Sequence, residues 1–261
     1  MLMMLQLAVL LLAPLALGLA KDDTFLNDLT SSIRDGNVGK LSSLLDNLPA
    51  DQTLPSLLSS EFAFGTLTPL QYAAKTNAAS IDLLISKGSD VNLAHVDTGT
   101  TPLMFAARNG EMDAVNTMLA HGADIATVDS LGSTALSIVA LTCNYEVAER
   151  LIQAGSQVNH FDNAGNNVLH VAAWYCDKEA GIIEDKVFKK DGGATFAKVL
   201  MKAIDPSEID SPSGTKRSAL MLSAMRGGTG FFDVLVENGA SRTLRSEKDQ
   251  KTADELMVKE L

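Results

Sequence analysis

The sequence predicts an all-α solenoid in which helix-turn-helix repeats stack on one another. Short apolar stretches are spaced for one face of a helix. The chain also repeats with a fixed period of 33 residues, and a period of this length is typical of repeat architectures. A residue that can cap a helix recurs every 33 residues, at Thr68, Thr101, Thr134 and Asn167. A glycine stands two residues before the last three of these positions, at Gly99, Gly132 and Gly165.

The first twenty residues differ in kind from the rest of the chain. They contain no charged side chain, and their Leu-rich run has the length of the apolar core of a secretory signal peptide. Gly18 and Ala20 supply the small residues that precede a signal-peptidase cleavage site. A stretch of this length can also span a bilayer as a retained anchor. Pro14 and the small residues at the end favour cleavage, so we expect residues 1–20 to be a signal peptide.

Residues 21–65 are interpreted as a degenerate first repeat and a long connection. The stretch 26–48 has apolar residues at helical spacing and an otherwise polar face, which is what the end of a solenoid needs where it meets water. The connection at 49–66 lacks the repeat pattern and is unusually long.

The repeats themselves occupy residues 66–248. Each copy begins with a residue whose side chain can cap a helix, and Pro follows it in two copies, where its fixed φ suits the first helical position. Pairs of alanines in the first helices are small enough to let neighbouring helices approach closely. We expect the leucines two residues after each cap to stack into one core: Leu70, Leu103, Leu136, Leu169 and Leu220.

The fifth copy is interrupted between its helices by a charged insertion at residues 177–193, whose secondary structure the sequence does not settle. The next copy therefore starts at Ser218, which is 51 residues after Asn167. Residues 249–261 match the start of a further copy and predict a C-terminal cap.

The repeated segments resemble the ankyrin repeat. The family motif begins T-P-L-H-x-A-A and ends G-A-D-V-N after a second helix, and the copies "TTPLMFAARNG" and "AHGADIA" follow it closely. The resemblance covers residues 25–261 and implies an ankyrin-repeat solenoid with β-hairpin-like loops and about five to six repeats, including degenerate caps. It also implies that the His170 ring forms hydrogen bonds between repeats.

The resemblance also predicts where a partner binds. In ankyrin folds the first helix of each repeat lines the concave face, and the two residues after the alanine pair point towards the partner. Hairpin turns would add Asp129 and Asp162 at an acidic rim. The alternative is that the insertion folds back over Trp174, which would then be buried in a small separate core. The predicted partner-binding residues are Arg108, Leu141, Trp174, Tyr175 and Met225, with Phe161 on a hairpin turn.

Cys143 and Cys176 are the only cysteines and occupy equivalent places in adjacent repeats. An oxidising compartment favours a disulfide between them. Packed helices lie roughly 8–10 Å apart, whereas the Cα atoms of a disulfide lie roughly 4.4–6.8 Å apart. The inter-helix turns would therefore have to lean together, and the sequence leaves the disulfide open.

Several classes of function are disfavoured by the sequence. The net charge of −11 argues against a nucleic-acid partner, because phosphate binding needs clustered Lys and Arg. The motifs of nucleotide-binding loops and zinc proteases do not occur. We therefore predict no catalytic residue, no metal site, no cofactor and no small-molecule substrate.

These observations predict a non-catalytic protein-protein interaction module that is secreted or lies in the lumen of the endoplasmic reticulum. Its partner, of unknown identity, should be partly apolar, with basic groups to meet the acidic rim. Two alternatives stay open. One is a membrane-tethered adaptor, which contacts the membrane only if residues 1–20 are retained. The other is a lumenal or periplasmic stress-protection protein that supports an enzyme.

Overall fold

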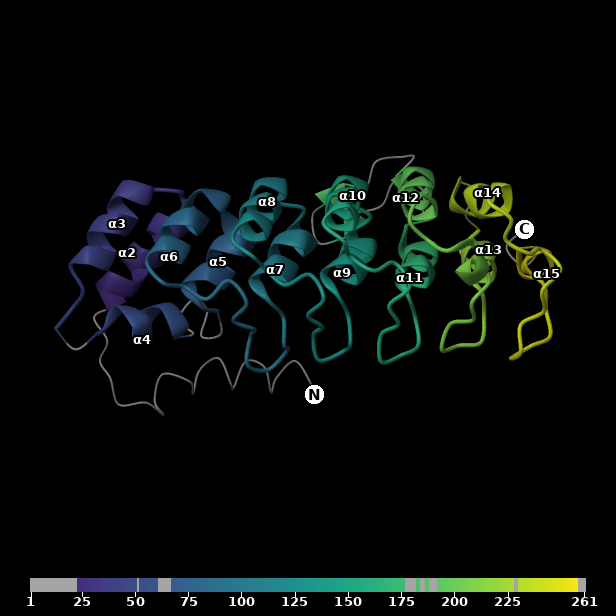
Figure 1. Cartoon of the computed structure of the whole chain (residues 1–261), viewed down its shortest axis with the longest axis horizontal. Helices are drawn as coiled ribbons and strands as arrows, with labels where there is room; N and C mark the ends of the chain where they lie inside the picture. The colour runs from purple at the N-terminus through teal and green to yellow at the C-terminus, as the bar shows by residue number, and fades with distance from the viewer. Residues whose placement is uncertain are drawn as a thin grey trace. The chain divides into compact units, whose positions relative to one another are not determined.

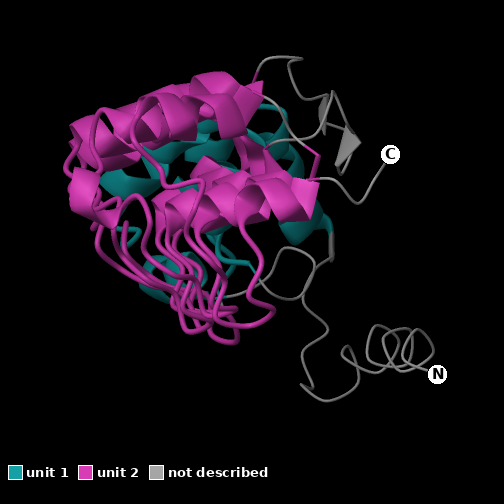
Figure 2. Cartoon of the chain, turned by 90° about the vertical axis from the view of Figure 1, so that its right-hand side faces the viewer, with its two compact units in different colours: residues 1–90 teal, residues 91–261 magenta. Residues whose placement is uncertain are grey.

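A computed structural model describes residues 23–50, 52–60, 67–176, 182–183, 186–187, 192–227 and 230–257. The predicted signal peptide lies outside these residues, and so does most of the insertion at 177–193. The chain divides into two compact units, residues 1–90 and residues 91–261, which are described separately below (Figure 2).

The first unit contains the N-terminal helix pair, a short helix in the long connection, and a second helix pair. Helix α4 was not predicted, because the connection has no repeat pattern, yet its Leu57 and Leu58 are buried. Helix α2 packs against both α3 and α5. The elements are α2 (Asp23–Arg34), α3 (Val38–Asp46), α4 (Leu54–Ser59), α5 (Pro69–Thr76), the 3-10 helix η2 (Ala78–Ser80) and α6 (Ile81–Ser86).

The second unit repeats one plan of a first helix, a second helix and a hairpin. Figure 1 shows the first helices in one layer, the second helices in another, and the hairpins projecting beyond the first helices. The first helices are α7 (Pro102–Asn109), α9 (Ala135–Thr142), α11 (Val168–Tyr175) and α13 (Ala219–Met225). The second helices are α8 (Met112–Ala120), α10 (Tyr145–Gln153), α12 (Gly192–Met201) and α14 (Gly230–Glu237), and α15 (Ala253–Met257) follows the last hairpin. The 3-10 helix η3 (Pro206–Glu208) follows α12.

The insertion falls between α11 and α12, as the sequence predicts. Its described residues are two short strands, β1 (Ile182–Ile183) and β2 (Lys186–Val187), which pair antiparallel. Helix α12 begins at Gly192, so the last two residues of the predicted insertion belong to a helix. Apart from this small ladder, the described elements are helical, and the predicted all-α solenoid is confirmed.

The predicted N-caps are also confirmed in the second unit. Each capping side chain accepts the backbone N–H of the residue three positions on, which satisfies one of the free donors at a helix start. These caps are Thr101, Thr134, Asn167 and Ser218. They fix where each first helix begins, and therefore which of its residues face the core.

The core of the second unit lies between the two helix layers. First helices pack on first helices, from α7 through α9, α11 and α13 to α15, and α12 packs on α10 and α14 in the second layer. The predicted leucines Leu103, Leu136, Leu169 and Leu220 are at most 1% exposed. Each buried leucine contributes roughly 1.5–3 kcal/mol, so this row is a large part of the stability of the unit.

The hairpins are joined to one another by backbone hydrogen bonds. The N–H of Ser130 donates to the carbonyl of Thr98 at 2.9 Å, and the N–H of Asn163 donates to that of Leu131 at 3.0 Å. Past the insertion, the N–H of Gly214 donates to the carbonyl of Gly165 at 2.7 Å. The hairpins before and after the insertion are therefore joined in the same way as those of consecutive repeats.

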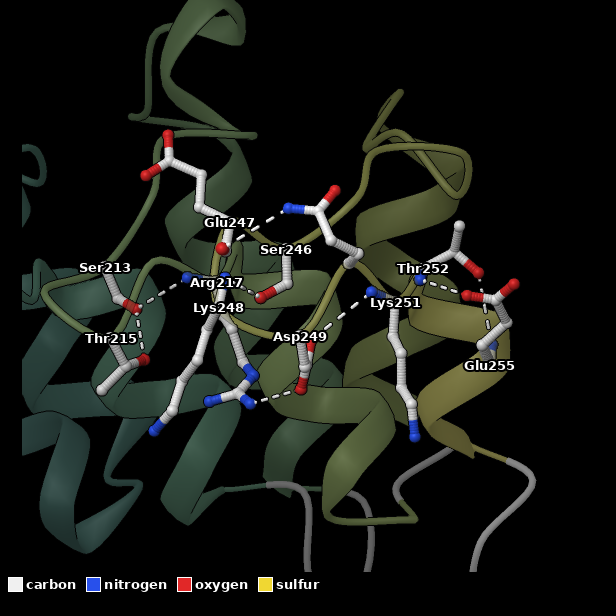
Figure 3. A network of polar contacts seen from close by, with 11 residues as sticks. Ser213, Thr215, Arg217, Ser246, Glu247, Lys248, Asp249, Lys251, Thr252 and Glu255 are labelled. Carbon is white, nitrogen blue, oxygen red and sulfur yellow. Dashed lines mark hydrogen bonds and ion pairs between the residues drawn. The ribbon is translucent and has the colours of Figure 1, made fainter.

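An ion pair fixes the last two hairpins to each other. Figure 3 shows Arg217, at the base of the hairpin before α13, reaching Asp249 in the hairpin before α15. Arg217 Nη2 lies 2.6 Å from Asp249 Oδ2, and the Arg217 side chain is 11% exposed. Burial of this kind reduces solvent screening, so the contact is stronger than a typical surface ion pair.

Candidate functional site

A pocket of about 270 Å³ opens between α11 and α13. It lies on the inner face, by which we mean the side of the second unit formed by α7, α9, α11, α13 and the hairpins before them. Apolar and aromatic side chains of the two helices form much of the wall, and residues at the base of the hairpins complete it. The lining residues are Val171, Trp174, Tyr175, Leu222, Met225, Asn166, His170, Thr215 and Arg217.

The repeat pattern explains why Trp174 and Tyr175 reach this pocket. Ala172 and Ala173 are fully buried against the neighbouring helices, so the next two residues turn towards the surface. Trp174 is half-buried, and Tyr175 is 42% exposed. Met225 holds the matching place in α13 and is half-buried. Large apolar groups left partly open to water gain about 25 cal/mol for each Å² that a partner covers.

Arg226 lies beside the pocket and stacks on Trp174. Its guanidinium carbon is 4.8 Å from the centre of the indole ring, which is within the range of a cation–π contact. The Nε atom of Arg226 is buried and has no hydrogen-bond partner among the described residues. The same holds for Nε of Arg217, whose Nη2 pairs with Asp249.

His170 joins the start of α11 to the next repeat, as the resemblance to ankyrin repeats implies. Its Nδ1 accepts the backbone N–H of Asn167 at 3.2 Å, so its Nε2 carries the proton and donates to the carbonyl of Ser211 at 2.8 Å. Burial lowers the pKa of His170 below its ordinary value of 6.5, against the opposing effects of the Ser211 carbonyl and Asp162. His170 therefore acts as a neutral structural group at the base of the pocket.

The structure brings together only part of the predicted partner-binding set. Trp174, Tyr175 and Met225 line one pocket. Phe161 is 41% exposed, and its ring centre is 6.2 Å from that of His170, so it continues the same surface. Leu141, which is 36% exposed, and Arg108, on α7, are at the surface but do not line the pocket. They occupy the matching places on neighbouring first helices.

Sequence reasoning missed the polar half of the pocket. Asn166 and Arg217 each stand one residue before an N-cap, which is a fixed position in the repeat. That position could have been identified as pocket-facing by extending the repeat alignment into the hairpins. The longer spacing across the insertion obscured the equivalence.

The two aspartates predicted at an acidic rim, Asp129 and Asp162, each accept backbone N–H groups of their own hairpin. Asp162 Oδ1 accepts the N–H groups of Ala164 and Asn166, at 2.9 and 2.8 Å. Asp129 does the same within its own hairpin, where Oδ1 accepts from Leu131 and Ser133. One oxygen of each carboxylate therefore shapes a turn, while Arg217 lines the pocket and Arg226 lies over Trp174.

Cys143 and Cys176 form a disulfide next to the pocket. Their Cα atoms are 5.4 Å apart, inside the range that the bond requires. Cys143 ends α9 in a left-handed conformation, with φ of 54°, where the equivalent Gly110 after α7 has φ of 74°. Cys176 ends α11 directly after Tyr175. The bond therefore ties the end of the pocket helix to the preceding repeat.

Within the ranges that the structure describes, no cluster of His, Cys, Asp and Glu could hold a metal ion. No helix in the same ranges is long and apolar enough to cross a membrane.

Comparison with known families decides the identity of the repeats. Residues 36–129 match the family model for ankyrin repeats in three copies, and residues 140–180 match a second model for ankyrin repeats in many copies. The two matches together cover just over half of the chain. This chain is an ankyrin-repeat protein. Ankyrin repeats are protein-binding modules, so the inner face is the natural place to look for a partner.

Curated relatives share the repeats but are much longer proteins. A probable E3 ubiquitin-protein ligase XBOS33 from Oryza sativa subsp. japonica is 36% identical over 115 residues, which are 43% of this chain and 21% of the relative. The E3 ubiquitin-protein ligase XBAT33 from Arabidopsis thaliana is 35% identical over 116 residues, with the same shares. The ankyrin repeat and SAM domain-containing protein 6 of Danio rerio is 35% identical over 69 residues, 26% of this chain and 9% of that protein. This chain spans about a fifth of the length of the two plant relatives.

Proposed function

We propose that this ankyrin-repeat protein binds a protein partner on its inner face, without catalysing a reaction, in the secretory pathway or outside the cell. The observation that most supports this is the pocket between α11 and α13, where Trp174 and Tyr175 stay partly open to water. Trp and Tyr are the residues most enriched at the energetic centres of protein interfaces.

The rigidity around the pocket supports the same proposal. The hairpins are hydrogen-bonded to one another, and the disulfide holds the end of α11. A surface that is ordered before it binds loses little conformational entropy on association, so more of the contact energy becomes affinity.

Two features support the proposed compartment. Residues 1–20 have the composition of a signal peptide. The disulfide between Cys143 and Cys176 suits an oxidising environment, because cytosolic thiols are kept reduced. The ligase activity in the names of the plant relatives belongs to those proteins, and we propose no enzymatic role for this chain.

The test is affinity capture with the immobilised protein, followed by mass spectrometry of the bound proteins. The double variant Trp174→Ala/Tyr175→Ala should lose a partner that the wild type retains. Val38, which is 37% exposed in the first unit, provides a matched control, and Val38→Ala should retain that partner. All three proteins must first unfold at similar temperatures. Equal capture by the wild type and the double variant would place the interface elsewhere.

A further inference from the structure

The size of the pocket indicates what can occupy it. Sites for cofactors and drug-sized ligands measure roughly 300–1,000 Å³, whereas a cavity of roughly 150 Å³ accommodates one benzene ring. At about 270 Å³, the pocket between α11 and α13 matches one or two side chains of a polypeptide. The apolar wall from Val171, Leu222 and Met225 favours an aliphatic or aromatic side chain there.

The charge beside that wall is positive, although the chain as a whole carries −11. Arg217 lines the pocket, where Asp249 balances its charge, and Arg226 lies over the ring of Trp174. The Debye length is about 8 Å at physiological ionic strength, so the distant carboxylates of the chain are largely screened at the pocket. Arg226, whose charge no carboxylate of the described residues balances, therefore decides which charge is attracted at contact distance.

Both arginines also keep a hydrogen-bond donor without a partner. Their Nε atoms are buried and unbonded within the described part of the chain, and Arg217 uses Nη2 for Asp249. These Nε atoms are closed to solvent, so a partner can reach only the exposed part of each guanidinium group, and Arg226 as a whole is half-buried. A carboxylate oxygen is the strongest acceptor for a guanidinium group, because the contact is charge-assisted.

We propose that the pocket binds a segment of the partner in which an apolar side chain stands next to an acidic residue. The apolar side chain enters between α11 and α13, and the carboxylate meets the guanidinium group of Arg226. This proposal rests on the proposed function, since it specifies the chemistry of the partner at the same face. It also differs from the basic partner that net charge alone would suggest.

The experiment uses random peptides displayed on phage, selected on the full disulfide-bonded protein and counter-selected on Trp174→Ala/Tyr175→Ala. Enriched peptides should share an apolar residue beside Asp or Glu. One such peptide is then synthesised with its acidic residue intact or replaced by Lys. Binding is followed by the fluorescence of Trp174, which is the only tryptophan of the chain and lines the pocket.

The wild type should bind the acidic peptide about ten-fold more tightly than the Lys peptide. Arg226→Glu should reverse that preference, and Lys198→Glu, an exposed change on α12, should leave it intact. Arg226→Gln serves if the reversed charge prevents folding, and it should remove most of the preference. Enrichment of basic peptides, no enrichment, or a preference that survives at Arg226→Gln would overturn the proposal. If partner capture still depends on Trp174 and Tyr175 in those cases, the proposed function stands and only this inference fails.

Discussion

His170 shows how one residue connects helix capping, packing between repeats and pocket shape. Its Nδ1 accepts a hydrogen bond from Asn167, and its Nε2 donates one to Ser211 in the next repeat. The bond at Nδ1 requires the neutral ring, because a second proton there would face the N–H of Asn167, whereas Nε2 can donate to Ser211 in either protonation state. The fold therefore favours the neutral form, and burial is the largest cause of the lowered pKa.

We predict that the stability of the protein falls when the pH drops below about 6.5. The pKa of His170 is lower in the folded chain than its ordinary 6.5, so its stabilising effect is complete above 6.5. The effect is lost as the pH falls from 6.5 through the lower folded value. Urea unfolding of wild type and His170→Gln across this range measures it. Gln71 already forms a capping box at the equivalent position of α5, so the variant keeps a cap without titrating.

Val38→Ala, an exposed change at a residue that does not titrate, supplies the control for this pH series. It should keep the wild-type pH dependence, whereas His170→Gln should flatten it. An unchanged slope in His170→Gln would mean that another group is responsible.

Residue-level reasoning from the sequence succeeded where the repeat fixes orientation. Trp174, Tyr175 and Met225 are placed together because they follow a pair of small buried residues, Ala172-Ala173 in α11 and Ser223-Ala224 in α13. Arg217 was missed because its role depends on Asp249 in the following hairpin, a contact that no local pattern encodes. The stacking of Arg226 on Trp174 also depends on packing between adjacent repeats.

At the scale of elements, the start of α11 departs from the hydroxyl caps of its neighbours α9 and α13, which are Thr134 and Ser218. Asn167 caps the helix with Oδ1, but its Nδ2 is buried without a hydrogen-bond partner among the described residues. Thr134 caps α9 with a hydroxyl that is also hydrogen-bonded to Ser137 Oγ, so its cap leaves no donor without a partner. Asn167→Thr should therefore raise the free energy of unfolding by about 1 kcal/mol, because the unsatisfied donor disappears.

Asn167→Ala should lower the free energy of unfolding by about 1 kcal/mol through loss of the cap. Urea unfolding of the two variants tests both signs, and equal destabilisation by both would contradict this account.

The hairpin before α13 approaches its neighbour so closely that only glycine fits. A Cβ atom at Gly214 would lie 1.7 Å from the carbonyl oxygen of Ala164, so the two hairpins would have to separate. We predict that Gly214→Ala destabilises the protein by several kcal/mol and weakens peptide binding at the adjacent pocket. The comparison is Gly192→Ala at the start of α12, where a Cβ meets no atom of the described residues within 4 Å. That variant should keep wild-type stability in thermal unfolding, and similar losses in the two variants would refute the steric explanation.

Element boundaries show what the sequence could and could not predict. Every first helix of the second unit was located from its cap, because the caps recur at a fixed spacing. Helix α4 was missed because it lies outside the repeat pattern. It is held in place by the burial of Leu57 and Leu58. The disulfide stayed open because the average distance between helices does not describe the turns, where Cys143 adopts its left-handed conformation.

At the scale of the whole molecule, the disulfide links two successive repeats and closes a loop with a sequence separation of 33. Loop closure of this length is worth about 3–4 kcal/mol in the chain-entropy estimate. A reductant should therefore lower the melting temperature of the wild type, by roughly 2–4 °C for each kcal/mol. Circular dichroism with and without reductant measures the shift.

The matched variant for this measurement is Cys143→Gly/Cys176→Ala. Glycine suits the positive φ at position 143, as it does at Gly110. This variant should melt at one temperature whether or not a reductant is present. A wild type that is equally insensitive would show that the disulfide does not limit unfolding.

The central claim, that the inner face beside α11 binds the partner, is tested most directly by site-specific photo-crosslinking. Benzoylphenylalanine would replace Tyr175 at the pocket in one protein and Lys198 on α12 in another. The account predicts that the captured partner is cross-linked from position 175 and not from position 198. Cross-linking from position 198 alone, or equally from both positions, would contradict it.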